Sequence, residues 1–258
     1  LLHRYWGRAL RTYRDSAALQ PVDRGFSPQP AAYENERTFS LDVVPQEYPS
    51  FGHGDFRIPG YQVQWENGTT VSELCYAGYQ ITAGKPALAG LPASYAKAGE
   101  AETLEIELQD VRHGFSVFLC YTVFADAPIL VRSTRLVNTG AERFRILQAG
   151  SMSLDFMDAD FERISLYGGH AKERSITRET LTHGIQETSS ARGASSHQQS
   201  PFLALVRPGT TEQQGEAYGF SLVYSGSFAL QTEVSQFDTT RVTAGINPFN
   251  FSWLLEAG

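Results

Sequence analysis

Apolar residues that alternate with polar ones constrain this chain more than any other feature. In "TLEIEL", Leu104, Ile106 and Leu108 alternate with polar residues, and "SMSLDF" (151–156) and "YQVQW" (61–65) repeat the same period of two. Successive side chains of a β-strand point to opposite faces, so this period is typical of strands with one buried face. The alternation predicts a chain built from β-strands.

Further strand-like segments follow at short intervals, separated by turn residues. "FSVFLCYTVF", residues 115–124, is apolar on both faces, which predicts a central strand covered on both sides. Asn67-Gly68 predicts a type I′ hairpin turn, because both central positions of that turn need positive φ. Other strands are predicted within 129–137, 144–149, 202–208, 218–225, 229–237 and 241–246.

More than ten short strands, with no amphipathic helix over three turns, predict an all-β fold. Its most direct form is a large antiparallel sandwich of two packed sheets with six or more strands each. The 258 residues contain no internal linker and no repeat of fixed period, so we expect one domain over 1–258. The abrupt, apolar start "LLHRYWGRAL" indicates that an upstream strand is missing and that the chain is part of a longer protein.

The charge balance excludes some classes of partner. The net charge is −7, whereas binding to nucleic acid needs a clustered basic surface, so we expect no nucleic-acid partner. No apolar run approaches the roughly 18 residues that span a bilayer, so we expect no membrane span. The six histidines have no ligand spacing, and Cys75 and Cys120 lie in apolar runs, which predicts buried free thiols and no metal site.

Two clusters carry chemistry-bearing residue types but are better explained as loops. The acidic segment 155–162, "DFMDADFE", misses the spacing of a calcium loop and fits an Asp-rich turn at the end of a strand. Ser195, Ser196 and His197 are adjacent in sequence, which is no evidence for a catalytic triad, since a triad is defined by geometry in space. We expect a hydrogen-bonded loop there.

Two loop segments combine charged and aromatic residues, as carbohydrate sites do. Residues 48–65, "YPSFGHGDFRIPGYQVQW", contain Asp55 and Arg57 among glycines and aromatic rings. Carboxylates and guanidinium groups bind adjacent sugar hydroxyls in pairs, and aromatic faces cover the C–H side of the ring. A buried Asp–Arg pair that braces the loop fits equally well. The segment 21–39, with Asp23 and Arg37, leaves the same two alternatives open.

Long strings across the whole chain resemble the N-terminal domain of α-galactosidases of glycoside hydrolase family 36. The strings are "YWGRAL", "DRGFSPQP", "RTFSLDVVPQEYPSFGHGDFRIPGYQVQWENG", "YGGHAKER", "RGASSHQQSPFLALVRPGTT" and "INPFNFSWLLEAG". The resemblance implies a β-supersandwich similar to galactose mutarotase, followed by a (β/α)8 barrel that carries both catalytic aspartates of a retaining mechanism. This chain has no alternating β–α pattern, so we expect no catalytic residue in it and no hydrolysis by it alone.

The resemblance also implies site residues, partners and a location. In tetrameric bacterial members, this domain completes the sugar pocket of a neighbouring subunit through an aspartate, an arginine and a tryptophan. The first two match Asp23 and Arg37; the third falls on His170 in "GGHAKER". Histidine keeps a flat ring but loses most of the stacking area, which puts the family's outer sugar subsite in question.

The whole protein is thus expected to hydrolyse α-galactosides of the raffinose and melibiose type, in the cytoplasm and without a cofactor. Its partners would be these sugars, the barrel of the same protein and of a neighbouring subunit, and further copies in a homotetramer. A free-standing carbohydrate-binding module is the alternative, and a mutarotase-type epimerase is disfavoured because no His/Glu acid–base pair stands out.

Overall fold

The computed structural model describes the whole chain except residues 6, 8–9, 13–24, 32–33 and 36–38. The described residues form fourteen β-strands and no α-helix, and every strand pair is antiparallel. The all-β antiparallel prediction is therefore confirmed. In this described part, no helix has the length and apolar character needed to cross a bilayer.

The central layer is a six-stranded sheet. Its strands follow the order β1 (Tyr61–Gln64), β6 (Phe144–Phe156), β13 (Thr240–Ile246), β12 (Phe228–Val234) and β9 (Gly184–Ser190), and β14 (Trp253–Leu255) pairs with β6 beside this path. β6 is the longest strand. Its first half pairs with β1 and β14, and its second half pairs with β13.

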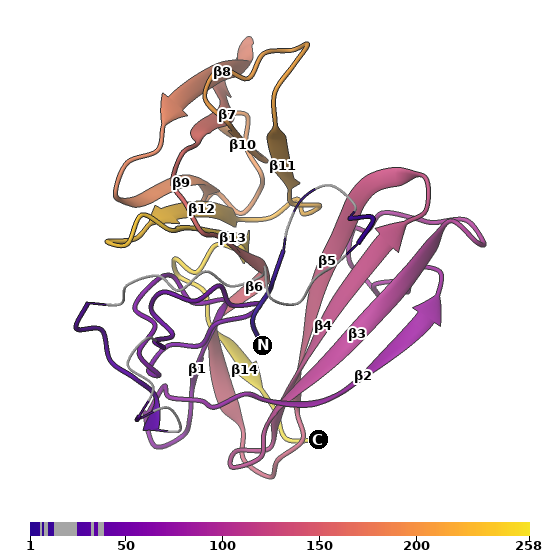
Figure 1. Ribbon diagram of the computed structural model, residues 1–258. Helices are drawn as coiled ribbons and strands as arrows, with labels where there is room; N and C mark the ends of the chain where they lie inside the picture. The colour runs from indigo at the N-terminus through magenta and orange to yellow at the C-terminus, as the bar shows by residue number, and fades with distance from the viewer. Residues whose placement is uncertain (6, 8–9, 13–24, 32–33, 36–38) are drawn as a thin grey trace.

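Two four-stranded sheets pack on this layer (Figure 1). One contains β11 (Ala217–Ser221), β10 (Gln199–Val206), β7 (Glu162–Gly169) and β8 (Lys172–Thr180). The other contains β2 (Cys75–Ala83), β3 (Ala101–Asp110), β4 (Phe115–Phe124) and β5 (Ala127–Asn138). The sandwich thus has three sheets instead of the two larger ones expected from strand count alone.

Two hydrophobic cores lie between these layers, and β6 contributes to both. The first core joins β6 and β1 to β3 and β4, and its members include Ile146, Val63 and Val117. The second joins β6, β12 and β13 to β10 and β11, and it includes Leu154 and Leu205. β6 can serve both cores because its two halves pair with different strands.

Two local predictions need correction. Gly68 has φ +84°, but Asn67 is not at positive φ, so the turn is not type I′; Gly68 N–H instead donates to the Trp65 carbonyl at 2.9 Å. Residues 69–74 then form no strand, and β1 pairs with β6 rather than with its sequence neighbour. β4 is central, as predicted, but its outer face is not fully covered, since Phe118 and Cys120 on that face are only half-buried.

Candidate functional site

Four buried charged side chains fix the loops that precede β1. Asp55 and Arg57 belong to these loops, Asp155 to β6 and Arg241 to β13, and none is more than 4% exposed. Arg241 Nε and Nη2 donate to the two oxygens of Asp155 at 2.6 and 2.7 Å, and Arg241 Nη2 lies 2.8 Å from Asp55 Oδ2. Arg57 Nε donates to Asp55 Oδ1 at 2.9 Å. We call these four residues the buried charge network.

Each charged side chain in this network stabilises the charged form of its partner. Burial alone would raise the pKa of Asp155, but the positive charge of Arg241 and its hydrogen bonds outweigh burial, so this pKa lies below its ordinary value. Burial would likewise lower the pKa of Arg241, but the Asp155 carboxylate outweighs it, and the pKa is raised. Asp155 and Arg241 therefore remain a charged pair in the folded chain.

The network closes the loop over residues 41–58 onto the central sheet. Arg57 Nη2 donates to the carbonyls of Leu41 and Val44 at 2.8 and 2.9 Å. Arg241 Nη1 donates to the Ile58 carbonyl at 3.1 Å. Because Asp55 and Arg57 are buried and paired, the structure supports the bracing role for them and not direct contact with a sugar.

A second anchor ties residues 25–28 to this braced loop. The Ser27 hydroxyl donates to Asp42 Oδ2 at 2.8 Å, and the Phe56 N–H donates to the other oxygen of Asp42 at 3.3 Å. The Ser40 hydroxyl donates to the Pro28 carbonyl at 2.7 Å. Segments 25–28 and 40–42 are thus held side by side.

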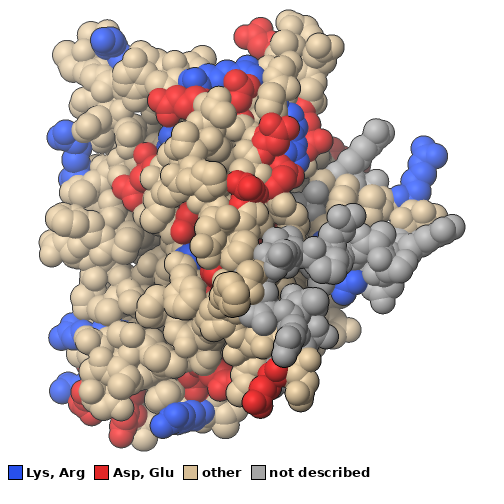
Figure 2. Space-filling view, turned by 60° about the vertical axis from the view of Figure 1, so that its left-hand side comes forward, with Lys and Arg blue, Asp and Glu red and all other residues tan. Residues whose placement is uncertain are grey.

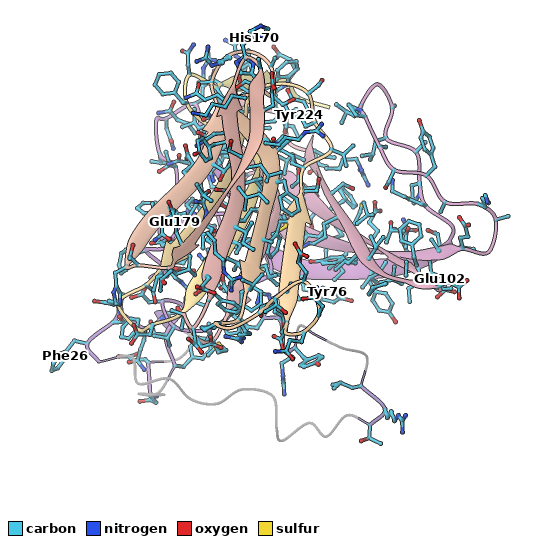
Figure 3. All side chains as sticks on the ribbon, turned by 90° about the horizontal axis from the view of Figure 1, so that it is seen from above. Phe26, Tyr76, Glu102, His170, Glu179 and Tyr224 are labelled. Carbon is cyan, nitrogen blue, oxygen red and sulfur yellow. The ribbon has the colours of Figure 1, made fainter. Side chains whose placement is uncertain are left out.

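Asp23 and Arg37 lie outside the described residues. The anchored segments begin close to them, since Gly25 follows Asp23 by two residues and Ser40 follows Arg37 by three. Phe26 is fully exposed and projects away from the sandwich in Figure 3. The structure therefore describes the anchored backbone that follows Asp23 and Arg37 in sequence, but not these two residues.

His170 is exposed at the tip of the hairpin between β7 and β8. Gly169 pairs with Lys172, and Ala171 between them has φ +58°, which makes this a tight turn. Figure 3 shows His170 at one end of the molecule and Phe26 at another. Within one copy of the chain, the structure does not bring His170 next to segment 25–28.

The acidic segment 155–162 forms a turn, as predicted, and its first residue belongs to the buried charge network. Asp160 N–H donates to Asp158 Oδ1 at 3.0 Å, and Arg207 Nη2 donates to Asp158 Oδ2 at 3.1 Å. Among the described residues, no group of three or more His, Cys, Asp or Glu side chains is placed to hold a metal ion.

The segment around Ser195 is a hydrogen-bonded loop, which confirms the prediction. Ser195 N–H donates to the Ser225 carbonyl at 2.8 Å, and the Ser196 hydroxyl accepts a bond from Gln198 N–H at 3.0 Å. His197 is exposed, and in the part of the chain that the structure describes its ring makes no hydrogen bond to either serine. This arrangement is not that of a nucleophile with its base.

Both cysteines are free, but the prediction that both are buried was wrong. Cys75 is exposed because it begins β2, a strand at the edge of its sheet. Cys120 is half-buried on the outer face of β4, where its thiol donates to Glu105 Oε2 at 3.4 Å. Burial, followed by this carboxylate, raises the pKa of Cys120 to about 11.

Sequence reasoning missed Arg241 and the role of Asp155. Arg241 lies in the apolar strand "RVTAGI" and has no exposed surface. A charged residue inside an otherwise apolar strand is the signal that could have found it, because burial of a charge requires a partner. Its partners, however, lie 86 and 186 residues away in sequence.

Acid should destabilise the chain partly through Glu47. Burial alone would raise the pKa of Glu47, but contact with His3 Nδ1, at 3.3 Å, and the charge of Arg132 outweigh burial and lower it. A lowered folded pKa gives stability above the unfolded value, about 4.3, that is lost as pH falls through the folded value. We expect urea midpoints measured between pH 6 and pH 3 to fall less steeply for Glu47→Gln than for the unmodified chain.

Glu66→Gln is the matched control for this prediction. Glu66 also faces an arginine, Arg143, at 3.7 Å, but its side chain is 59% exposed, so this pair contributes little to stability. Its curve should follow that of the unmodified chain. Equal slopes for Glu47→Gln and the unmodified chain would contradict the contribution of Glu47.

Comparison with known proteins identifies the family. The model of the glycosyl hydrolase family 36 N-terminal domain matches residues 1–256. The chain belongs to glycosyl hydrolase family 36, as its N-terminal domain. Asp23, Arg37 and the anchors around Ser27 all fall within the matched family 36 domain.

The chain is similar to this domain in longer bacterial proteins. It is 52% identical to α-galactosidase AgaA of Geobacillus stearothermophilus, with 100% of the chain aligned to 35% of the relative, and 43% identical to α-galactosidase Mel36A of Lactobacillus acidophilus over 99% of the chain. The crystal structure of AgaA matches with a TM-score of 0.96 over 100% of this chain and 36% of that one. Variants of AgaA were solved in complex with raffinose and with stachyose. The chain spans about 35% of the length of AgaA.

Proposed function

We propose that this chain is the N-terminal domain of a longer retaining α-galactosidase that hydrolyses terminal α-galactosides of the raffinose and melibiose type. The similarity to AgaA over the whole chain, at 52% identity, carries the proposal. The domain supports the catalytic barrel and contributes to the substrate pocket, while the reacting carboxyls lie on the barrel. The reaction needs no cofactor.

Asp23, Arg37 and His170 are the proposed substrate-binding residues. A carboxylate and a guanidinium can each bind two neighbouring hydroxyls of a sugar. Such binding needs a fixed position of the side chain, which a flexible loop would not provide. The anchors at Ser27, Asp42 and Ser40 support this proposal, since they order the backbone close to Asp23 and Arg37. Figure 3 shows His170 and Phe26 at different ends of the molecule, which supports a pocket that more than one subunit completes.

The proposed partners are α-galactosides, the barrel of the same protein, the barrel of a neighbouring subunit and further copies in a homotetramer. On the family resemblance we also propose a cytoplasmic enzyme. In Figure 2, acidic and basic side chains are interspersed on the face that is drawn, an arrangement that suits contact with neutral sugars and protein better than with nucleic acid.

Hydrolysis by the full-length protein tests the function. We expect release of galactose from melibiose and raffinose by the full-length protein, and none from the 258-residue chain alone. If the chain is instead a free-standing carbohydrate-binding module, it should bind sugar, and neither the full-length protein nor the 258-residue chain should hydrolyse it. A full-length protein that binds raffinose but leaves it intact would therefore contradict the α-galactosidase function and favour the carbohydrate-binding module.

Asp23→Ala tests the site in the full-length protein. We expect kcat/KM for raffinose to fall about tenfold or more, because one charge-assisted hydrogen bond to the substrate is lost. Asp126→Ala is the control, since Asp126 is exposed in the turn between β4 and β5. Unchanged kinetics for Asp23→Ala, with unchanged assembly, would make Asp23 a structural residue of the loop.

His170→Trp tests the outer part of the pocket. A tryptophan ring restores stacking area, worth about 0.5–1.5 kcal/mol, so we expect the ratio of kcat/KM between stachyose and melibiose to change by about two- to twelvefold. His183→Trp, at another exposed histidine, should leave this ratio unchanged. An equal response of all substrates to His170→Trp would argue against contact between His170 and the sugar chain.

A further inference from the structure

The turn that follows β1 carries the dipeptide Asn67-Gly68, and the proposed function gives it no role. Asn67 is the one asparagine of the chain that precedes a glycine, since the other four precede larger residues. Residues 66–69 are all exposed. Glycine has no side chain to crowd its own nitrogen, and even an added Cβ atom at Gly68 would meet nothing within 4 Å. The space around the Asn67–Gly68 peptide bond is therefore open.

The turn holds the Asn67 side chain by its amide oxygen. Asn67 Oδ1 accepts a hydrogen bond from the Thr69 N–H at 3.0 Å and a second from the Thr69 hydroxyl at 2.8 Å. Among the described residues, the Asn67 Nδ2 group donates to no acceptor. Two donors thus meet at the amide oxygen, while nothing in the described chain retains the amide nitrogen.

This arrangement suits one reaction of asparagine, the loss of its side-chain amide. The Gly68 nitrogen loses its proton to a base from the solvent and attacks Asn67 Cγ. The new N–Cγ bond closes a five-membered imide, the Cγ–Nδ2 bond breaks, and the amide leaves as ammonia after taking a proton from the solvent. Water then opens the imide at either carbonyl, which gives aspartate or isoaspartate.

The two bonds from Thr69 act on the step in which the imide forms. Attack on Asn67 Cγ places negative charge on Oδ1, the atom to which both Thr69 donors already point. Donors that are fixed where charge develops lower the barrier of such a reaction. The folded turn therefore contributes to the rate beyond what the dipeptide alone provides.

One contact opposes the reaction. The Gly68 N–H donates to the Trp65 carbonyl at 2.9 Å, so this bond must open before the nitrogen can attack. β1 ends at Gln64, and the bond therefore lies outside the strands. Exposed turns open locally at a small cost in free energy. The bond delays the attack without preventing it.

We propose that Asn67 is a site of spontaneous deamidation in the folded protein, and that Thr69 promotes the reaction through its two bonds to Oδ1. The reaction needs water and no other partner. Each event places a carboxylate next to Glu66 and adds one negative charge to the net charge of −7. The proposal does not depend on hydrolysis of α-galactosides.

Incubation of the full-length protein in mildly alkaline buffer tests the proposal, because base removes the Gly68 proton. We expect acidic species to accumulate on ion exchange, and mass spectrometry of the peptide that contains residue 67 to show aspartate and isoaspartate there. Asn67→Ser should abolish these species. Asn250, which is also exposed but precedes Phe251, should stay intact.

Thr69→Ala separates the folded turn from the dipeptide. We expect deamidation of the full-length protein to slow about two- to twelvefold, the equivalent of one ordinary hydrogen bond, and Thr69→Ser to restore the rate. A synthetic peptide of residues 64–70 has no folded turn, so the same change in it should leave the rate unaltered.

Three results would overturn the proposal. The first is an intact Asn67 in the full-length protein under conditions in which the synthetic peptide loses its amide. The second is faster deamidation of Thr69→Ala, since the bonds to Oδ1 would then protect the amide. The third is an equal rate for Thr69→Ala and the unmodified protein, which would leave the turn without a part in the reaction.

Discussion

Arg241→Met should lower the free energy of unfolding by about 3–5 kcal/mol, the usual loss when one partner of a buried ion pair is removed. Methionine fills much of the space of the arginine stem but leaves Asp155 and Asp55 without the guanidinium that lies 2.6–2.8 Å from them. For a domain of this size, the loss corresponds to a fall in melting temperature of about 10 °C. Urea unfolding and calorimetry measure both quantities.

Arg143→Met is the matched control for this prediction. Arg143 also faces a carboxylate, Glu66, but both side chains are 59% exposed and 3.7 Å apart, so the change should cost less than about 1 kcal/mol. If Arg241→Met cost no more than Arg143→Met, the buried charge network would not hold the loop over 41–58. The anchors next to Asp23 and Arg37 would then need another source of order.

The sequence predicted well those elements whose burial follows a simple period. β1 and β3 alternate between apolar and polar residues, and each was predicted within a few residues of its observed bounds. β6 was predicted as two strands, 144–149 and 151–156, which the structure joins into one. β8 and β9, "KERSITRET" and "GIQETSS", were not predicted. Both are edge strands whose side chains are mostly polar on both faces, so periodicity carries no signal there.

The candidate site was predictable only in part, for a different physical reason. Asp55 and Arg57 were recognised as a pair, but the choice between sugar contact and bracing depends on Asp155 and Arg241, which reach them only through the fold. The family 36 resemblance supplied Asp23, Arg37 and His170, which composition could not single out. Their proposed contacts involve other parts of a longer protein, and no pattern within 258 residues encodes these.

Gly150→Ala should be the second most damaging of these changes, with a loss of about 2–3 kcal/mol in unfolding free energy. Gly150 lies in the middle of β6, between the halves that serve the two cores. Its N–H donates to the Gly60 carbonyl at 2.8 Å, and its own carbonyl accepts bonds from Tyr48 and Thr134, both at 2.8 Å. A Cβ atom on Gly150 would lie 2.6 Å from the Gly60 oxygen, so backbone would have to move.

Gly219→Ala provides the comparison, because a Cβ atom at Gly219 on β11 meets only Phe202, at an ordinary 3.9 Å. Alanine should there be neutral or stabilise by up to about 1 kcal/mol, through the reduced entropy of the unfolded chain. A similar small effect at Gly150 would mean that β6 can shift away from Gly60 at little cost. Gly60 lies directly before β1, and the braced loop leads into it. That result would therefore mean that the packing of the two cores and the support of the proposed sugar site do not depend on each other.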